Sequence, residues 1–392
     1  MDTYLERSIT KDFVRSMEKN KVLILLGTRR TGKTLFLNHV IEKVIKKDYL
    51  FLNGENITTQ ELLKERSIEN YKRLIGNNKY LIIDEAQNIE NIGWILKLIY
   101  DTIKGITIIA TGSSSFDLNN KTGEPLTGRK ITYHLFPFSQ AEFSTIENLV
   151  KTKSNLTNRM VFGCYPELIH LQSDHDKKMY LNELVSSYLF KDILMLDGIK
   201  NASKIYDLLK LLAFQTGSMV SLEELGKNLN MSKNTVAKYM DLLTKVYVIF
   251  PLKGLSRNLR NELTKKRKWY FYDNGILNSI INNFNPVSLR NDVGQLWENY
   301  IISERIKFQF NNRLLVNNYF WRTYQQQEID WVEEVNGKFN AYEFKWNTVR
   351  QPKTPPQWKK AYPDSPFKIV TPNNYLSFIN PLSPDFSQNM TS

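Results

Sequence analysis

The sequence predicts an α/β fold whose core is a parallel β-sheet. Short apolar runs, such as 22–26, 80–83 and 106–110, alternate with segments of helical spacing. This alternation is typical of parallel strands that helices cover on both faces. A glycine-bounded loop follows the first run, and two carboxylates follow the second. Both features come directly after predicted strands, where open α/β sheets bind their ligands.

The length of 392 residues predicts two or three domains with substantial cores. We expect a core at 1–137, a helical lid at 138–202, a winged helix at 203–270 and a further α/β domain at 271–392. Within the first of these, residues 1–20 read as a polar helical stretch. Arg7 in this stretch could border a base, although a surface helix is the favoured interpretation.

The loop after the first apolar run has the pattern G-x-x-x-x-G-K-[ST]. Its residues are Gly27, Thr28, Arg29, Arg30, Thr31, Gly32, Lys33 and Thr34, and Leu35 continues into a helical pattern. Glycines let the backbone wrap around polyphosphate, while successive N–H groups and the helix N-terminus face the anion. We therefore expect these nine residues to bind ATP, with Lys33 at the β- and γ-phosphates and the Thr34 hydroxyl on Mg²⁺. The alternative is a chance glycine-rich turn.

Two carboxylates follow the second apolar run, at Asp84 and Glu85. We expect Asp84 to complete the Mg²⁺ shell and Glu85 to orient or deprotonate the attacking water. A solvated acidic turn after a core strand is the alternative. The pairing with the upstream loop favours the nucleotide site.

Polar residues after the strand at 106–110 are placed to touch the γ-phosphate or the attacking water. Ser113 is the favoured residue and Thr111 the second, and a serine-rich helix cap is the alternative. Arg129 follows a glycine and could be an arginine finger for its own or a neighbouring subunit, so a homo-oligomer is one expectation. Arg30 is the other arginine that could stabilise the γ-phosphate charge.

Composition narrows the class of protein. No apolar run is long enough to span a bilayer, and the N-terminal residues show no signal pattern, so we expect a cytoplasmic protein without membrane association. The single cysteine, Cys164, and four scattered histidines make a zinc centre an unlikely expectation. The net charge of +13 favours anionic partners such as nucleic acid, but AT-rich coding explains a lysine-rich composition equally well.

The segment 222–243 has the spacing of a helix-turn-helix, with Ser232 as N-cap of its second helix and a wing strand opening at 246. Its outward-facing residues are expected to be Lys233, Asn234, Lys238 and Tyr239. Seven basic residues follow, at Lys253, Arg257, Arg260, Lys265, Lys266, Arg267 and Lys268. DNA and a protein partner both remain open, because winged helices serve either purpose.

The runs 328–332 and 341–346 predict a strand pair joined by a turn at Asn336 and Gly337. Asp330 on one strand could meet Glu343 and Lys345 on the other. Such a set is the composition of a metal-dependent phosphodiesterase, with Asp330 and Glu343 as metal ligands. Ordinary charge pairing in a hairpin is the alternative.

The order of segments resembles a family of prokaryotic P-loop ATPases of the AAA+ superfamily, with an AAA-type core, a winged helix and a C-terminal DUF4143 domain. The segments that carry the resemblance are GTRRTGKT, YLIIDEAQ, ATGSSS, LTGRK, LFPFSQAEF, GCYPE, YLFKDI, WYFYDNGI, LWENYIISER, YFWRTYQQQEIDW and AYEFKW. Family members often have Gly-Gly-Tyr-Pro where this chain has Cys164 as the second residue.

The resemblance implies a C-terminal domain similar to the PD-(D/E)xK nuclease fold, also described as restriction-endonuclease-like. It places the acidic positions at Asp330 and Glu343, the lysine at Lys345, and a helix carboxylate at Glu298. It also strengthens the arginine-finger reading of Arg129. The sequence thus predicts a Mg²⁺-dependent ATPase that couples ATP to a DNA-directed C-terminal domain. The alternative is a nucleotide-controlled switch whose nuclease-like domain is inactive and binds a protein.

Overall fold

The computed structural model describes residues 4–112, 126–189, 202–256, 267–347 and 352–381. The chain divides into two compact units. The first comprises residues 1–136 and 245–247, and the second comprises 137–244 and 248–392. No helix within the described ranges is both long enough and apolar enough to cross a bilayer.

The first unit is a five-stranded parallel sheet, which confirms the predicted fold class. Its strand order is β2-β3-β4-β1-β5, and its strands are β1 (Val22–Leu26), β2 (Tyr49–Asn53), β3 (Tyr80–Asp84), β4 (Thr107–Gly112) and β5 (Lys130–His134). Its helices are α1 (Thr10–Ser16), α2 (Lys33–Val40), α3 (Ile57–Lys64), α4 (Ile68–Ile75) and α5 (Ile92–Thr102). β1 is buried along its whole length and pairs with β4 and β5.

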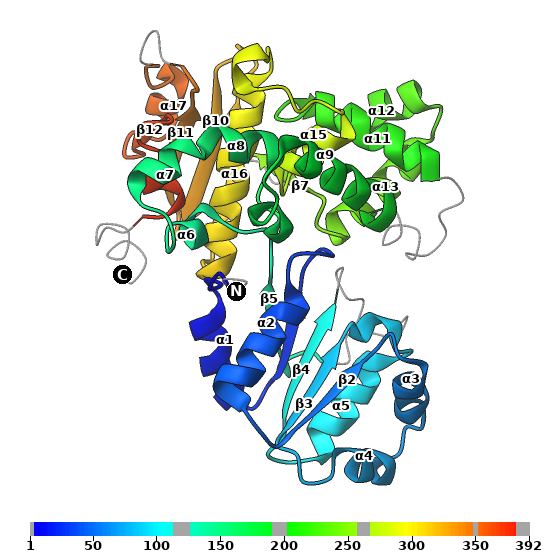
Figure 1. Ribbon diagram of the computed structural model, residues 1–392. Coiled ribbons are helices and arrows are strands. Elements are labelled where there is room, and N and C mark those ends of the chain that lie inside the picture. The colour runs from blue at the N-terminus through cyan, green and yellow to red at the C-terminus, as the bar shows by residue number, and fades with distance from the viewer. Residues whose placement is uncertain (1–3, 113–125, 190–201, 257–266, 348–351, 382–392) are drawn as a thin grey trace. The chain divides into compact units, whose positions relative to one another are not determined.

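Alternating side chains of β1 pack into two separate hydrophobic cores. Leu23 and Leu25 pack with residues of α1 and α2 on one face, whereas Ile24 and Leu26 pack with residues of α4 and α5 on the other. Figure 1 shows these helices on the two faces of the sheet. A strand that is buried on both faces explains the uninterrupted apolar run in the sequence.

The second unit is built on a seven-stranded mixed sheet of order β12-β11-β10-β9-β7-β8-β6. Its strands are β6 (Met219–Val220), β7 (Ile249–Gly254), β8 (Arg267–Phe271), β9 (Asn317–Arg322), β10 (Glu328–Val335), β11 (Lys338–Phe344) and β12 (Phe367–Val370). β7 pairs in parallel with β9. One sheet therefore runs through the segments predicted as a winged helix and as the C-terminal domain, and β8 spans the predicted boundary at residue 270.

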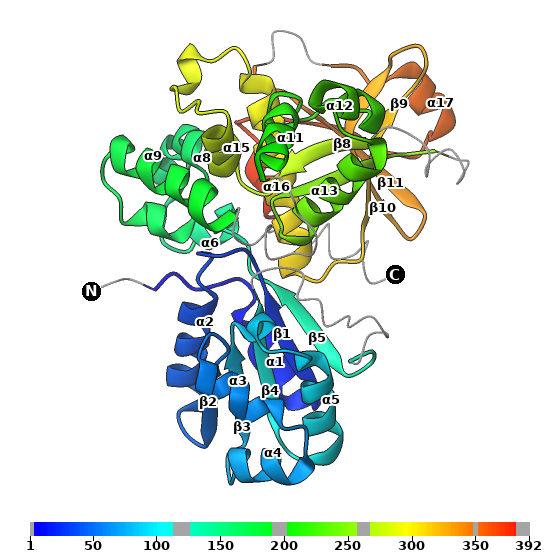
Figure 2. The same ribbon diagram turned by 90° about the vertical axis from the view of Figure 1, so that its right-hand side faces the viewer.

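Helices of the second unit begin with α6 (Gln140–Phe143), α7 (Leu149–Ser154), α8 (Leu156–Phe162) and α9 (Asp174–Glu183) in the segment predicted as a lid. They continue with α11 (Ala202–Phe214), α12 (Leu222–Leu229), α13 (Lys233–Lys245), α15 (Asn274–Ile280), α16 (Val293–Asn311), α17 (Pro356–Ala361) and α18 (Tyr375–Ile379). Figure 2 shows α11, α12 and α13 beside β8. α12 and α13 occupy the two helical segments of the predicted helix-turn-helix.

The predicted hairpin at 328–346 is present as β10 and β11, which pair antiparallel. Asn336 and Gly337 at its turn both have positive φ, of 50° and 76°. Two successive positive φ values are the signature of the tight hairpin turns that Asn-Gly favours. The turn therefore fixes the register that brings Asp330 towards the end of β11.

Candidate functional site

The phosphate loop connects the carboxyl end of β1, at Leu26, to the first residue of α2, Lys33. Gly32, with φ of 89°, precedes the helix, and Thr31 Oγ1 donates to Thr28 O at 2.8 Å. A Cβ on Gly27 would lie 2.2 Å from Leu135 O, so only glycine fits there. The helix begins at Lys33, two residues before the predicted apolar pattern, and Leu35 lies exposed in its first turn.

Thr34, Asp84 and Thr111 form a chain of hydroxyl and carboxylate contacts across three elements. Thr34 Oγ1 donates to Asp84 Oδ2 at 2.7 Å, and Thr111 Oγ1 donates to Asp84 Oδ1 at 2.5 Å. The backbone N–H of Glu85 donates to Thr111 Oγ1 at 2.9 Å. Thr111, the second choice from the sequence, therefore holds both acidic residues of the site in place.

Lys33 is buried beside the loop and close to Glu85. Its side chain is 3% exposed, its Nζ donates to Gly27 O at 3.1 Å and Thr28 O at 3.2 Å, and it lies 3.8 Å from Glu85 Oε1. Glu85 itself has φ of 48°. A non-glycine residue in this left-handed region costs roughly 1–3 kcal/mol and is found most often at functional sites.

The residues at this edge of the sheet fit a nucleotide-bound Mg²⁺ ion. The Thr34 hydroxyl and the Asp84 carboxylate are hard oxygen donors, which is the ligand type that Mg²⁺ prefers. Two protein ligands suffice, because Mg²⁺ in such sites takes its remaining ligands from phosphate and water.

Arg129 lies at the opposite end of the sheet from the phosphate loop, which corrects its predicted role within its own chain. The register pairs Lys130 with Val22 and His134 with Leu26, so Arg129 precedes the amino end of β5. Four strand residues span about 13 Å. Arg129 Nε instead donates to Asp101 Oδ1 at 2.8 Å. A finger role towards a neighbouring subunit stays a prediction.

Ser113 and Arg30 are the other residues predicted to contact the γ-phosphate. Ser113 lies outside the described residues. Arg30 is exposed within the loop with φ of 64°, and Arg29 beside it is partly buried. Their part in binding γ-phosphate stays a prediction.

Arg7 is a residue of this site that the sequence interpretation placed on a surface helix. It is 6% exposed, and its guanidinium donates to Thr31 O at 3.2 Å and to Phe136 O. Because it precedes β1 by fifteen residues without a motif, only the fold reveals its contact with the loop. The same N-terminal segment stacks Tyr4 on His39 of α2, with ring centroids 3.9 Å apart.

In the second unit, the predicted Asp330, Glu343, Lys345 and Glu298 come together with a residue from the predicted basic stretch. Lys268 of β8 is 4% exposed and lies 2.6 Å from Glu328 and 3.5 Å from Glu298. Tyr270 OH donates to Glu298 Oε1 at 2.6 Å. Lys268 is therefore unavailable to DNA. Tyr239, also predicted to face outward, is 7% exposed.

The remaining two carboxylates of this acidic cluster also have protein partners. The backbone N–H of Phe344 donates to Asp330 Oδ2 at 2.8 Å, and Lys345 pairs with Glu343 at 2.7 Å. Among the residues that the structure describes, no group of three or more His, Cys, Asp and Glu side chains could hold a metal ion. Lysines pair with Glu298 and Glu343 in this cluster, and metal binding by Asp330 and Glu343 stays a prediction.

Burial and mutual repulsion alter the pKa values in the cluster. Burial raises the pKa of Glu298 to about 7, and the pKa of Glu343 rises to about 7 through burial and the charge of Asp330. Burial also raises the pKa of Asp330. For Lys268, burial acts to lower the pKa, but the carboxylates of Glu298, Asp330 and Glu328 outweigh it and raise the pKa.

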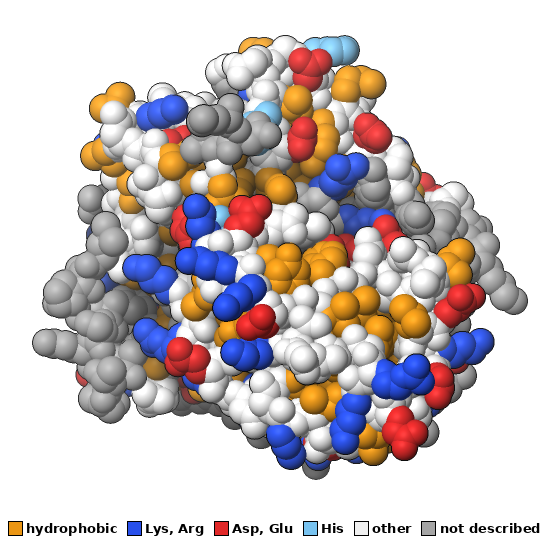
Figure 3. All heavy atoms as spheres, turned by 60° about the horizontal axis from the view of Figure 1, so that its bottom comes forward, with side chains coloured by type: hydrophobic (Ala, Val, Ile, Leu, Met, Phe, Trp, Pro, Cys, Tyr) orange, Lys and Arg blue, Asp and Glu red, His pale blue; other side chains and the backbone are white. Residues whose placement is uncertain are grey.

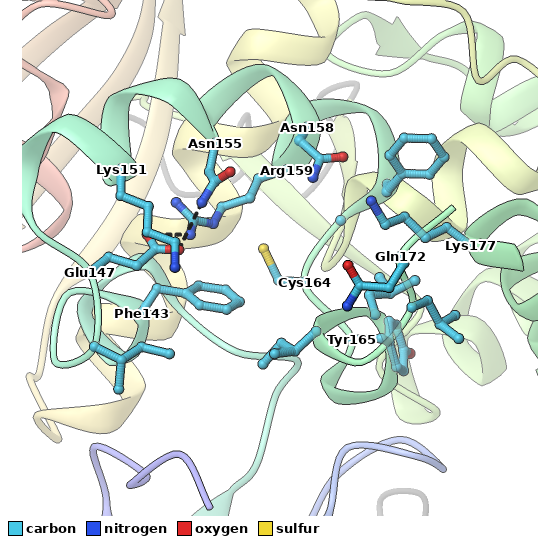
Figure 4. Close-up of a pocket in the computed structure, with 16 residues that line it drawn as sticks. Phe143, Glu147, Lys151, Asn155, Asn158, Arg159, Cys164, Tyr165, Gln172 and Lys177 are labelled. Atoms are coloured by element: carbon cyan, nitrogen blue, oxygen red, sulfur yellow. Dashed lines mark hydrogen bonds and ion pairs between the residues drawn. The ribbon is translucent and has the colours of Figure 1, made fainter. Parts of the chain in front are cut away.

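A separate cavity of about 360 Å³ lies among α6 to α9 (Figure 4). Cys164 lines it near the middle of the view, with Lys151 and Lys177 towards opposite sides. The Gly163 turn beside it has φ of 75°, and a Cβ there would lie 2.0 Å from Asp273 Oδ1. Asp273 in turn accepts the backbone N–H of Cys164 at 2.8 Å. The Gly-Cys-Tyr-Pro segment thus forms a turn that packs closely against Asp273. Burial raises the pKa of the Cys164 thiol.

Three family models match the chain. Residues 19–144 match a model described as AAA domain, residues 153–287 match a domain of unknown function (DUF8612), and residues 293–377 match a domain of unknown function (DUF4143).

Two curated relatives are similar to most of the chain. The chain is 26% identical over 346 residues to the uncharacterized protein MJ1544 of Methanocaldococcus jannaschii, which covers 83% of this chain and 74% of that protein. It is 24% identical over 335 residues to the uncharacterized protein Rv2008c of Mycobacterium tuberculosis, covering 84% and 71%.

Solved structures with some similarity include the Pif1 helicase from Candida albicans and Cdc6p from Pyrobaculum aerophilum. The first has a TM-score of 0.28 at 13% identity and covers 46% of this chain and 48% of that one. The second has a TM-score of 0.28 at 13% identity and covers 72% and 97%. TM-scores this low do not establish a shared fold or function.

Proposed function

Since residues 19–144 are an AAA domain and residues 293–377 a DUF4143 domain, we propose that the chain is a Mg²⁺-dependent ATPase whose nucleotide state controls the second unit. One observation carries the proposal. The hydroxyl of Thr34 and the carboxylate of Asp84, which lie fifty residues apart in sequence, are 2.7 Å apart. This contact joins the phosphate loop to the acidic strand end as ATP hydrolysis requires.

Each side chain at the phosphate loop has its own role in the proposed hydrolysis of ATP. Lys33 binds the β- and γ-phosphates once it turns from the loop carbonyls, and Glu85 holds the attacking water and accepts its proton. Thr111 fixes Asp84 and the Glu85 backbone, so these two acids keep their relative position. Mg²⁺, held by Thr34 and Asp84 when bound, neutralises charge on the phosphates. Arg30 is the loop arginine available to the γ-phosphate in the same chain.

The test is ATP turnover by the purified full chain with Mg²⁺. Wild-type protein should release phosphate, and Lys33→Ala should abolish both turnover and ATP binding. Lys43→Ala, an exposed lysine in the turn that continues α2, is the matched control and should behave like the wild type. Equal turnover in Lys33→Ala and wild type would refute the proposal.

For the second unit we favour the non-cleaving alternative. The buried Lys268 supports it, because an ammonium that pairs with Glu298 and Glu328 supplies the positive charge that a catalytic metal would bring. Single- and double-stranded DNA should survive incubation with Mg²⁺ or Mn²⁺, with or without ATP. Cleavage that disappears in Glu343→Ala would instead establish an ATP-linked nuclease.

DNA binding by α13 is a separate proposal for the second unit. Lys233, Asn234 and Lys238 are exposed on this helix, although Lys233 pairs with Glu223 at 2.5 Å. On the face shown in Figure 3, Lys and Arg side chains are interspersed with Asp and Glu. The net charge of +13 alone does not assign DNA to α13.

Salt dependence tests direct contact with DNA. Each phosphate contact should add about 0.9 to the slope of log affinity against log salt. Lys238→Ala should reduce the slope by one contact, whereas Lys104→Ala, an exposed lysine of the first unit, should leave it unchanged. A slope of zero would favour a protein partner for this helix.

A further inference from the structure

Arg7 joins the phosphate loop to the point where the chain leaves the first unit. One guanidinium nitrogen donates to Thr31 O at 3.2 Å and the other to Phe136 O. Phe136 is the last residue of the first unit before the chain enters the second at Pro137. We propose that Arg7 is a positioning residue that transmits nucleotide occupancy of the loop to this crossing, an inference that rests on the proposed ATP binding.

The contact on the loop side involves a peptide group that would also face the nucleotide. The carbonyl of Thr31 accepts from Arg7, and the N–H of the same peptide group belongs to Gly32. Because a peptide group is planar, rotating this N–H towards a phosphate rotates the carbonyl against the guanidinium. Donation from the charged guanidinium also polarises the peptide and strengthens its N–H as a donor to an anion.

The contact on the other side reaches the chain segment that follows β5. Leu135 N donates to Leu26 O at 2.7 Å, immediately before the loop begins. Gly27 lies so close to this segment that a Cβ would come within 2.2 Å of Leu135 O. Loop and crossing thus touch backbone to backbone, with Arg7 as the side chain that links them.

Beyond the crossing, the chain is anchored at once within the second unit. Phe138 N donates to Cys164 O at 2.9 Å, and Phe138 O accepts from Lys307 Nζ at 3.1 Å. Lys307 belongs to the buried helix α16. Only Pro137 separates the residue that Arg7 holds from the residue that the second unit holds. A displacement of Phe136 must therefore be taken up at this short junction.

A purely structural arginine would give a different result from a transmitting one. If Arg7 only donates hydrogen bonds that stabilise the fold, its loss weakens the fold and nucleotide binding together. If it transmits, Arg7→Lys retains the charge and one hydrogen bond but cannot span both carbonyls, because lysine lacks the planar fork. Nucleotide binding then persists while the response at the crossing is lost.

The experiment is hydrogen–deuterium exchange of the full chain with Mg²⁺, with and without a non-hydrolysable ATP analogue. In the wild type, the analogue should slow exchange in the loop peptide around 27–34 and change exchange in the peptide around 135–139. Arg7→Lys and Arg7→Met should keep the first effect and lose the second. Arg15→Met, an exposed arginine of α1, is the matched control and should keep both.

Three results would overturn the inference. One is a change at 135–139 that persists in both folded Arg7 variants. Another is protection of the wild-type loop without any change at 135–139. The third is loss of loop protection in the folded Arg7 variants, which would mark Arg7 as a structural residue of the loop. The absence of loop protection in the wild type is distinguishable from all three, because it refutes ATP binding itself and the inference with it. Arg7→Lys keeps the test valid if Arg7→Met does not fold.

Discussion

Thr111 Oγ1 lies 2.5 Å from Asp84 Oδ1 and accepts the Glu85 backbone N–H at 2.9 Å, so one hydroxyl fixes both acids of the nucleotide site. Thr111 is 1% exposed. A buried hydroxyl that donates to one residue and accepts from the next determines their relative orientation.

Replacing Thr111 by valine should therefore impair turnover more than ATP binding. Valine keeps the shape but leaves Asp84 Oδ1 and the Glu85 N–H without this partner. Loss of such a supporting hydrogen bond typically costs about 10–100-fold in metal affinity or activity. Steady-state kinetics with Mg²⁺ titration should show this loss, and Thr111→Ser should restore most of it. Valine and serine variants of equal activity would argue against the role.

Glu85→Gln should retain ATP binding and lose most hydrolysis. The amide keeps the size of the side chain but cannot accept a proton, and general-base catalysis typically contributes about 10²–10⁴-fold. Single-turnover measurements with bound ATP would isolate this step. Glu90→Gln, in the exposed segment before α5, serves as control. Hydrolysis at the wild-type rate would assign the water to another residue.

Arg129→Ala should leave turnover unchanged at dilutions where the chain is a single copy. The reason is its place before the amino end of β5, with Asp101 as its partner, away from the phosphate loop. Turnover should be measured over a range of protein concentrations. A loss of activity that appears only at high concentration would support the finger role towards a neighbouring subunit.

Lys268→Met should strongly destabilise the second unit. The substitution removes the buried cation that faces Glu298, Glu328 and Asp330. Breaking one side of a buried pair costs about 3–5 kcal/mol. Arg322→Met is the matched control, because Arg322 pairs with the same Glu328 but is 33% exposed. Its cost should be about 0–1 kcal/mol. Urea unfolding measures both, and equal effects would contradict the buried role of Lys268.

Burial raises the pKa of Glu298 from its ordinary value of 4.5 to about 7, and this shift predicts the pH dependence of stability. Between these values the folded state binds more protons than the unfolded state, so the free energy of unfolding should fall as pH rises through this window. Glu298→Gln should flatten the decline, with Glu343 contributing what remains. Unfolding midpoints measured from pH 4.5 to 8 would test this, and a rise with pH in the wild type would contradict it.

The residues that the structure brings together at the phosphate loop could be chosen from the sequence because their pattern is local. A glycine-bounded loop, a buried strand and two carboxylates can each be recognised from a few consecutive residues. Arg7 and Lys268 could not be recognised in this way, because their partners lie more than twenty residues away in sequence. Lys268 even suggested the opposite role, since a lysine within a basic stretch resembles a surface residue until the fold buries it among carboxylates.

The strand pairing across the predicted boundary at residue 270 could not be predicted for a related reason. Pairing of β7 with β9 joins residues that are about 66 positions apart, Lys253 with Tyr319 and Gly254 with Phe320. A short turn such as Asn336-Gly337 determines hairpin pairing, whereas parallel pairing between distant segments leaves no pattern in the local sequence. The position of Arg129 likewise required the register of β5 against β1.

The parallel pairing of β7 with β9 also limits how this chain can be divided. A fragment that begins at residue 271 would lack β6, β7 and β8 and would expose the backbone of β9 as an open edge, which promotes aggregation. It would also lose Lys268, the buried cation that faces Glu298 and Glu328. Residues on both sides of this pairing therefore belong to one sheet, although two family models divide them between residues 287 and 293.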